Sequence, residues 1–280
     1  MKTLLSIRCC AVLATLGLAL GPIAHAASST YTSTASVNWN DAGNWLSGVL
    51  PLDGDDVTIA DTTAHSSVTL NDGPHTVGTL QFGTTGTRTA VFTINGNISG
   101  AGAYALTITN GVVANGALAT ASGNLILKVP IIVQGDQTWS VGGSIPATTS
   151  DYGIALTPQA NGTQRPLTLN GTLTKTGPGE LVLIGQNVGD GSIVVNQGWL
   201  KINAGSSTLV TVGGTGTITV NSGATFMIAK NSGSLNVTKA IALNDGATFR
   251  LGGNNSTLNA IGSLVTFNGR WPRRLRQSPS

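Results

Sequence analysis

Three stretches of the chain share one pattern: Asn196-Gln-Gly-Trp-Leu-Lys-Ile202, Asn221-Ser-Gly-Ala-Thr-Phe-Met-Ile228 and Asn244-Asp-Gly-Ala-Thr-Phe-Arg-Leu251. Each begins with a turn of asparagine and glycine, the residues that best tolerate a positive φ. A short strand follows, and its alternate apolar residues point to one face. The leading asparagines lie at positions 196, 221 and 244, so the pattern recurs after 25 and then 23 residues. This period matches one round of a parallel β-helix, a solenoid with two or three short strands per round.

From about Val68 onward, the chain continues as short strands separated by Gly, Asn and Asp turns. Examples are Val91-Phe-Thr-Ile94, Leu125-Ile-Leu-Lys128 and Leu181-Val-Leu-Ile184. With 38 glycines in 280 residues and 9% charged side chains, the composition excludes collagen, helical bundles and a disordered chain. A β-sandwich or antiparallel barrel is the competing interpretation, but those folds use longer strands and more aromatic residues than 5%. The predicted fold is therefore all-β, a parallel β-helix.

The first 26 residues are typical of a signal peptide. Lys2 and Arg8 precede an apolar run, Cys9–Leu20, and Ala24-His25-Ala26 forms an A-x-A cleavage site. The run is shorter than the roughly 20 apolar residues that a transmembrane helix needs. We predict cleavage after Ala26 and a secreted or cell-surface protein.

Removal of the leader changes both the number of cysteines and the net charge of the chain. Cys9 and Cys10 lie in the leader, so the mature chain has no thiol and no disulfide. The 14 basic residues fall to 12, against 11 acidic ones, which leaves a net charge of +1. Four of these 12 are arginines within residues 269–280, so the body carries no basic face for a nucleic acid.

Residues 269–280 (Gly-Arg-Trp-Pro-Arg-Arg-Leu-Arg-Gln-Ser-Pro-Ser) differ in composition from everything before them. Two explanations stay open: a truncated or frameshifted gene, or a natural basic tail that touches anionic surfaces. Under truncation, the last round would present an open strand edge, which promotes self-association.

One segment resembles a known family. Leu173-Thr-Lys-Thr-Gly-Pro-Gly-Glu-Leu-Val-Leu-Ile-Gly-Gln-Asn187 and Gly191-Ser-Ile-Val-Val-Asn-Gln-Gly-Trp-Leu-Lys-Ile202 are similar to the autotransporter-associated β-strand repeat. The matching positions are Lys175, Gly177, Gly179, Leu181, Leu183, Gly185, Asn187, Val195, Gly198 and Leu200. The family's aromatic residue after the asparagine is replaced by Val188-Gly189-Asp190. Looser similarity extends over about residues 37–267 and includes Trp39–Trp45, Ile94–Gly102 and Gln137–Val141.

The resemblance implies a right-handed parallel β-helix of a bacterial secreted or surface passenger, in which the repeat supports export and folding. We expect a leader (1–26), an N-terminal segment that caps the first round (27–66), a repeat domain (67–268) and the basic tail (269–280). We expect the chain to depart from the family in having no translocator β-barrel and no sorting anchor after the repeats.

The acidic residues give no catalytic pattern. Asp55 and Asp56 are the only adjacent pair, and neighbours on a strand point to opposite faces. The Asp53-Gly-Asp-Asp56 turn fits capping of a loop, with a weak calcium site as the alternative. Glu180 is expected to be a solvated carboxylate in the Gly177-Pro-Gly-Glu180 turn, and Asp136, Asp190 and Asp245 are expected in ordinary turns. His65 and His75 are too few for a histidine metal site, and no nucleophile elbow accompanies them.

The tryptophans and the polar turns are assigned structural roles. Trp39 and Trp45 are expected to pack over the first round, and Trp139 and Trp199 to lie in the core or at its rim. Stacked asparagines and threonines are expected to form ladders, and a flat threonine face could bind ordered surfaces.

These observations predict a structural or adhesive surface element without catalytic, cofactor-binding or metal-binding residues. Surface polysaccharide or host-cell components are the expected partners, with no nucleic acid, no membrane span in the mature chain, and a monomer or edge-mediated self-association. The alternatives are a β-helix enzyme or binding module that acts on carbohydrate, which would need carboxylates converging on one face, and a fragment of a longer autotransporter-like protein.

Overall fold

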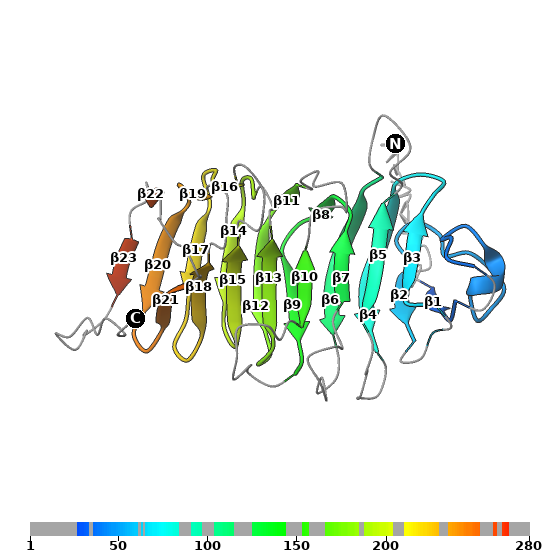
Figure 1. Cartoon of the computed structure of the whole chain (residues 1–280), viewed down its shortest axis with the longest axis horizontal. Helices are drawn as coiled ribbons and strands as arrows, with labels where there is room; N and C mark the ends of the chain where they lie inside the picture. Colours follow the sequence, from blue (N-terminus) through cyan, green and yellow to red (C-terminus); the bar gives the residue numbers. More distant parts are fainter. Residues whose placement is uncertain are drawn as a thin grey trace, which may run out of the picture.

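The computed structural model describes residues 27–33, 36–60, 63, 65–83, 91–96, 104–114, 125–143, 153–156, 166–184, 188–203, 210–229, 235–252, 260–261 and 265–268. The predicted leader, the tail 269–280, Gly185, Asn187 and most of the Ile94–Gly102 segment lie outside these residues. The described chain forms one elongated stack of short strands (Figure 1). Its secondary structure is β apart from one 3₁₀ turn, η1 (Ala42–Asn44).

The strands belong to three sheets. Sheet A has twelve strands: β1 (Ser28–Tyr31), β2 (Asp56–Ile59), β4 (His75–Phe82), β6 (Leu106–Ala114), β8 (Ile131–Val133), β9 (Gln137–Val141), β11 (Leu167–Leu169), β12 (Thr172–Thr176), β14 (Ser192–Val195), β17 (Thr217–Val220), β20 (Ala240–Asn244) and β23 (Val265–Asn268). Sheet B has eight: β3 (Ser67–Leu70), β5 (Phe92–Gly96), β7 (Leu125–Lys128), β10 (Ile154–Leu156), β13 (Glu180–Ile184), β15 (Trp199–Asn203), β18 (Thr225–Ala229) and β21 (Thr248–Gly252). Sheet C has three: β16 (Val210–Val212), β19 (Leu235–Val237) and β22 (Ala260–Ile261).

Neighbouring strands in all three sheets are parallel. The chain alternates between sheets A and B, and each return places a strand beside the previous strand of the same sheet, as in the order β12-β14-β17-β20-β23. The prediction of an all-β fold with short parallel strands is therefore confirmed, and the antiparallel interpretation is wrong for the described strands. The one antiparallel contact there is an isolated bridge between Tyr31 and Trp45.

The sheets enclose one apolar core built from columns of residues in register. One column of sheet B is Val68, Ile94, Leu127, Leu156, Leu183, Ile202 and Ile228, all at most 1% exposed. The predicted alignment of the three quoted stretches is also confirmed, since Leu200, Phe226 and Phe249 are register partners. A parallel stack of this kind buries side chains that are far apart in the sequence but one strand apart in space.

In the repeated turns, the glycine and the asparagine have different roles. Gly198, Gly223 and Gly246 have φ values of +65°, +78° and +79°, which explains the glycine in each repeat. The asparagines do not have positive φ, so this part of the prediction is wrong. They form a ladder instead: Asn221 Nδ2 donates to Asn196 Oδ1 (2.6 Å), Asn244 to Asn221 (2.6 Å) and Asn268 to Asn244 (3.2 Å). The predicted asparagine ladder is thereby confirmed.

Residues around η1 close the β1 and β3 end of the stack (Figure 1). Trp39 and Trp45 are each 2% exposed, and their rings meet edge-to-face with centroids 4.9 Å apart. Trp45 Nε1 donates a hydrogen bond to the Trp39 carbonyl oxygen at 2.9 Å. Both tryptophans pack in the core, as the sequence predicts, and are not available for stacking on a ligand.

Candidate functional site

The carboxylates of the Asp53–Asp56 turn are all engaged by backbone N–H groups. The donors are Thr76 to Asp53 (3.1 Å), Ala27 and Leu52 to Asp55 (3.0 and 2.9 Å), and Thr79 to Asp56 (2.5 Å). Most of these donors lie 23 or more residues away, on a neighbouring strand of the stack. These carboxylates therefore fix strands to one another, as expected for the structural interpretation of this turn.

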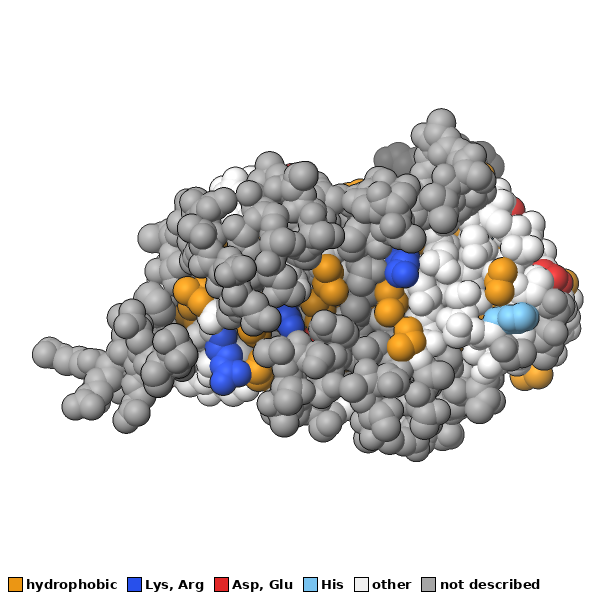
Figure 2. Space-filling view, in the orientation of Figure 1, with side chains coloured by type: hydrophobic (Ala, Val, Ile, Leu, Met, Phe, Trp, Pro, Cys, Tyr) orange, Lys and Arg blue, Asp and Glu red, His pale blue; other side chains and the backbone are white. Residues whose placement is uncertain are grey.

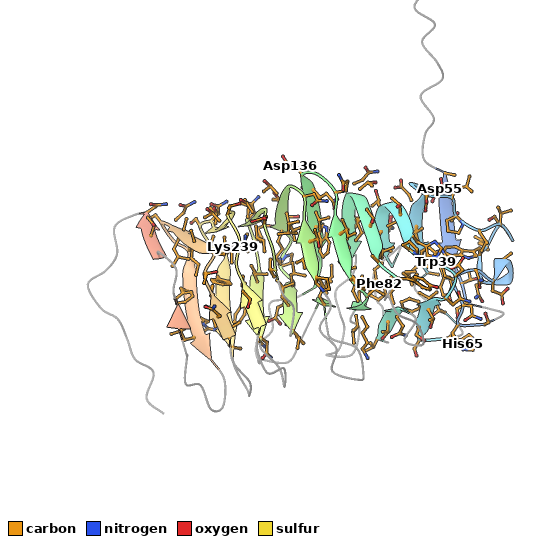
Figure 3. The ribbon with its side chains drawn as sticks, turned by 90° about the horizontal axis from the view of Figure 1, so that it is seen from above. Trp39, Asp55, His65, Phe82, Asp136 and Lys239 are labelled. Atoms are coloured by element: carbon orange, nitrogen blue, oxygen red, sulfur yellow. The ribbon has the colours of Figure 1, made fainter. Side chains whose placement is uncertain are left out.

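Asp136 and Asp190 act in the same way further along the chain. Asp136 accepts a hydrogen bond from the Thr172 N–H at 2.7 Å, and Asp190 accepts from the backbone and hydroxyl of Thr215 at 2.9 and 3.2 Å. The bonds from Thr215 lower the pKa of the exposed Asp190 carboxyl. Asp55 and Asp136 lie along the same long edge of the molecule (Figure 3). They are spread along that edge and do not converge on one point.

The two histidines lie in different segments, and His75 directly precedes Thr76, whose N–H donates to Asp53. His65 lies on the opposite long edge from Asp55 and Asp136 (Figure 3). His75 Nε2 is 2.8 Å from Asp72 Oδ1, and its ring lies 4.9 Å from that of Trp39. In the described part of the chain, no three His, Cys, Asp or Glu side chains are grouped so that they could hold a metal ion.

Glu180 is buried, so the prediction of a solvated carboxylate is wrong. It begins β13, is 2% exposed, and lies on the outward side of sheet B with Oε1 3.9 Å from Lys201 Nζ. Lys201 is 4% exposed. Each charge of this pair compensates the other, because either charge alone would be strongly destabilising at a buried position. No substrate reaches this pair from the solvent.

Lys175 occupies an inward position in sheet A, between Trp139 and Val195 in register, and is fully buried. Its ammonium group donates to the carbonyl oxygens of Gly177 (2.8 Å), Gln197 (2.9 Å) and Thr176 (3.2 Å). These are all three donors that an ammonium group has. The lysine therefore ties the turn that follows β12 to the turn that follows β14. Burial lowers the pKa of Lys175 to about 7, while the Glu180 carboxylate acts in the opposite direction.

Lys239 is a second fully buried lysine at the start of β20. Its Nζ donates to the Gly191 carbonyl oxygen at 2.8 Å, 48 residues earlier in the chain. Burial lowers the pKa of Lys239, and the Asp190 carboxylate acts against that shift. Buried lysines thus connect turns of different rounds at two places in the stack: Lys175 joins adjacent turns, and Lys239 reaches a turn two strands away.

Trp139 and Trp199 have different environments. Trp139 is fully buried in β9, whereas Trp199 is partly exposed at the start of β15, with the Arg250 guanidinium 5.0 Å from its ring. Trp199 and Arg250 lie on the outward side of sheet B, in adjacent columns. The expectation of a core position is confirmed for Trp139, whereas Trp199 points away from the core and packs against Arg250.

From β9 to β23, the middle of the outward side of sheet A carries no charged side chain among the described residues. Its central column, from β9 to β23, consists of small side chains in register, partly or fully exposed: Thr138, Thr174, Val194, Thr219, Ala242 and Thr266. Thr172, Ser192 and Thr217 lie in the column on one side, and the asparagine ladder follows the other. We call this surface, over β9, β12, β14, β17, β20 and β23, the hydroxyl face.

The outward side of sheet B contrasts with the hydroxyl face. One of its columns contains Val182, Lys201 and Met227, which are 0%, 4% and 6% exposed, and ends at the exposed Arg250. Hydrophobic side chains and Lys or Arg side chains lie close together on the face of the molecule in Figure 2. Both sides of sheet B are therefore largely buried between β13 and β18, as is common for parallel sheets.

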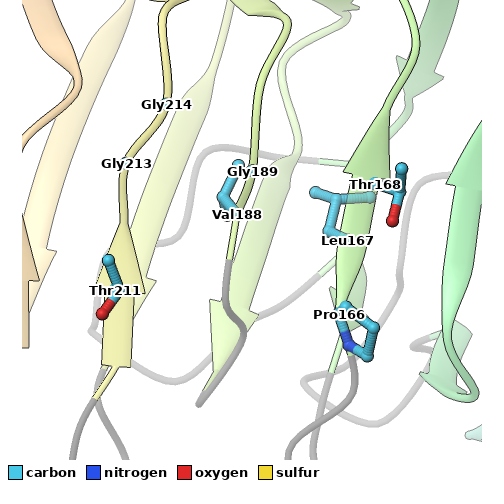
Figure 4. Close-up of a pocket in the computed structure, with 8 residues that line it drawn as sticks. All are labelled: Pro166, Leu167, Thr168, Val188, Gly189, Thr211, Gly213 and Gly214. Atoms are coloured by element: carbon cyan, nitrogen blue, oxygen red, sulfur yellow. The ribbon is translucent and has the colours of Figure 1, made fainter.

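A shallow hollow of about 340 Å³ opens between β11 and β16 (Figure 4). Val188 alone bridges Leu167 of β11 to Val212 of β16 at this level of the stack. The lining residues are Pro166, Leu167, Thr168, Val188, Gly189, Thr211, Gly213 and Gly214. A Cβ atom added at Gly189 would meet no other atom within 4 Å, so the absent side chain leaves the space open. No acidic or basic side chain lines the hollow.

Sequence reasoning did not find the buried lysines or the hollow. The strand Thr172-Leu-Thr-Lys-Thr176 does contain a signal for Lys175, because it shares the inward parity of the apolar Leu173. The hollow depends on Gly189 lying between β11 and β16, which come from other parts of the chain. A local pattern does not contain that information.

Comparisons with models of protein families, with curated protein sequences and with solved structures find no match to this chain. The resemblance to the autotransporter-associated repeat therefore remains a prediction from the motif. Among the described residues, no helix has the length and apolar character to cross a membrane.

Proposed function

We propose that this chain is an exported, right-handed parallel β-helix of the autotransporter-associated repeat type, which acts as a structural or adhesive element at the bacterial surface and has no catalytic activity. The observation that carries the proposal is the continuous register of the central column on sheet A, which runs through six strands from Thr138 to Thr266. A repeated unit that contacts its neighbours on both sides builds an extended, stiff body.

The use of the charged groups supports a structural function. The carboxylates of Asp53, Asp55, Asp56, Asp136 and Asp190 accept backbone N–H groups, mostly from neighbouring strands of the stack. Lys175 and Lys239 are similarly directed at backbone carbonyls. A catalytic carboxylate pair needs groups that face one substrate across about 5–10 Å, with room for it between them. These charged groups therefore hold the strands and turns of the stack together.

Export can be tested on the protein itself. When the full chain is expressed in a Gram-negative host, we expect the exported protein to start at Ala27, as read from its N-terminal peptide by mass spectrometry. The physical reason is the A-x-A site after an apolar run of signal-peptide length. A protein that keeps residues 1–26 and stays in the cytoplasm would overturn the proposed location.

The adhesive and catalytic alternatives give opposite results with insoluble polysaccharides. We expect the purified protein to be depleted from solution by at least one polysaccharide of a panel, without release of reducing ends into the supernatant. Release of soluble sugar that disappears in an Asp55→Asn/Asp56→Asn variant would overturn the proposal in favour of an enzyme. Asp245→Asn is the matched control, because this aspartate is exposed in a turn.

A soluble-sugar-binding module is the second candidate, and the hollow at Gly189 favours it. Thr168 and Thr211 place hydroxyl groups beside an apolar floor that includes Pro166 and Val188. Sugar sites commonly combine an apolar surface with a few polar groups. Gly189→Leu fills the hollow without meeting any atom at its Cβ. Binding of a soluble oligosaccharide that this variant abolishes would establish the second candidate.

A further inference from the structure

The hydroxyl face has the properties of a surface that binds another flat, uncharged and regular surface. Its central column from β12 to β23 contains five small residues in direct register, and none of them is charged. Adjacent strands lie about 4.8 Å apart, and residues two apart along a strand are separated by about 6.6 Å. The face thus presents hydroxyl, methyl and amide groups on a fixed grid about 20 Å long.

From this grid we infer that the hydroxyl face is the adhesive surface of the protein, and that its partner is a neutral crystalline polysaccharide. The inference rests on the proposed function and deepens it by naming the face and the chemical class of the partner.

The side chains on the face suit such a partner because they are rigid and can both donate and accept hydrogen bonds. Thr174 and Thr219 flank Val194, and within the described part of the chain their hydroxyls have no hydrogen-bond partner. Threonine has a restricted χ1 torsion, so little conformational entropy is lost when its hydroxyl is held against a ligand. A sugar hydroxyl offers the same two capacities, donor and acceptor, and needs no opposite charge.

The absence of charged side chains from the central column excludes the main competing partners. An anionic partner such as a nucleic acid or an acidic lipid needs lysine or arginine, which the central column lacks. Described basic side chains with solvent access lie elsewhere, such as Lys128 and Arg250 on sheet B. A protein partner is disfavoured because hot spots in such interfaces are rich in Trp, Tyr and Arg and poor in Ser and Thr. A crystalline polysaccharide is flat, neutral and periodic, as the face is.

The exposure of sheet A shows that this surface is available. Thr138 and Thr266 are exposed, and Thr174, Val194 and Thr219 are partly exposed in the middle of the sheet. The equivalent positions of sheet B are closed, since Val182 is fully buried. At the centre of the two outward sides, Val194 of sheet A is therefore accessible to solvent, whereas Val182, Lys201 and Met227 of sheet B are buried.

The test uses protein produced from the full chain, with microcrystalline cellulose and crystalline chitin as probes in a depletion assay. We expect at least one probe to bind the wild type at both low and high salt, since the contact involves no charge. Thr174→Lys/Thr219→Lys should reduce the bound fraction at least tenfold, because two long, strongly hydrated side chains would interrupt the flat grid. Circular dichroism should show the β-sheet content of the wild type, because both positions point outward.

The matched control is Thr93→Lys/Thr107→Lys. It makes the same chemical change and the same change in net charge at two partly exposed threonines of β5 and β6, outside the hydroxyl face. We expect this control to bind both probes as the wild type does.

Three results would overturn the inference: binding of neither probe by the wild type, equal binding by the two double variants, or binding that is lost in high salt. Equal binding by the variants would leave the proposed adhesive function standing and place the adhesive surface elsewhere. Release of reducing ends from the probes would instead contradict the proposed function itself.

Discussion

The outward sides of sheets A and B both belong to parallel strands in register, yet the residues at their centres differ in exposure. Val194 in β14 is partly exposed, whereas Val182 in β13 is fully buried, although both point away from the common core. The neighbours of Val194 in register are Thr174 and Thr219, while Lys201 and Met227 follow Val182. Strand geometry alone therefore does not decide which side of a strand is interior. The decision depends on what lies against the sheet.

The largest expected effect is a difference in stability between lysine variants of these two valines. Val182→Lys should lower the free energy of unfolding by about 3–5 kcal/mol, because it buries an unpaired charge opposite Lys201. Val194→Lys should cost less than about 1 kcal/mol, because its amine reaches water. Urea unfolding followed by circular dichroism gives both values. Equal losses for the two variants would contradict the difference between the two sides.

The second expected effect concerns the buried ion pair. Lys201→Met should cost about 3 kcal/mol, because it removes the positive charge beside the buried Glu180 carboxylate. The double variant Glu180→Gln/Lys201→Met should recover most of this loss, since neither charge of this pair remains. A urea-based double-mutant cycle measures the coupling, with the partly exposed Lys128→Met as the control. Strict additivity of the two losses would contradict a buried pair on the outward side of sheet B.

The third expected effect is a dependence of stability on pH that comes from the interior of sheet A. The pKa of Lys175 is about 7 in the folded protein, below the ordinary value of 10.5. Between these values the unfolded chain holds a proton that the folded chain has lost, so the free energy of unfolding increases with pH. We expect a gain of about 2 kcal/mol from pH 7 to pH 9 from this one group.

Lys175→Met provides the comparison for this measurement. The variant should lose that part of the increase while keeping any part that comes from Lys239, whose pKa is also lowered by burial. Urea unfolding at pH 7, 8 and 9 for both proteins gives the difference. Parallel pH profiles for the wild type and the variant would show that Lys175 does not titrate in this range.

The smallest expected effect concerns the asparagine ladder beside the hydroxyl face. Asn221→Ala removes two ladder hydrogen bonds and should cost about 1–2 kcal/mol. Asn268→Ala removes one exposed bond at the end of the ladder and should cost about 0.5 kcal/mol. Thermal and urea unfolding measure both losses. A larger loss at Asn268 than at Asn221 would contradict a ladder whose inner members are the more important.

Part of the difference between the two outward sides can be read from the amino-acid sequences of the strands. Thr172-Leu-Thr-Lys-Thr176 in sheet A alternates, whereas Glu180-Leu-Val-Leu-Ile184 in sheet B is a nearly continuous apolar run. Alternation is typical of a sheet with one side in water, and a continuous run is typical of a sheet buried on both sides. Glu180 was predicted to belong to the turn before this strand, and so its carboxylate was expected in solvent, whereas it is the first residue of β13.

The candidate sites were less predictable than the fold. The acidic turn Asp53–Asp56 was expected to be structural, and its carboxylates do bind backbone N–H groups. Lys201 and Lys239 carry no local sign of burial, because their partners Glu180 and Gly191 are 21 and 48 residues away. The hollow at Gly189 likewise combines three segments of the chain.

The sequence by itself determined the strand-and-turn pattern, the parallel register of the three quoted repeats, the glycine turns and the asparagine ladder. These features follow from alternation along a strand and from backbone conformation, which act over a few residues and then recur. Only the tertiary structure decided how far each outward side is covered, and that Glu180 and Lys201 are buried on the outward side of sheet B. Burial is set by neighbouring strands and segments that are distant along the chain, so no single stretch of residues contains it.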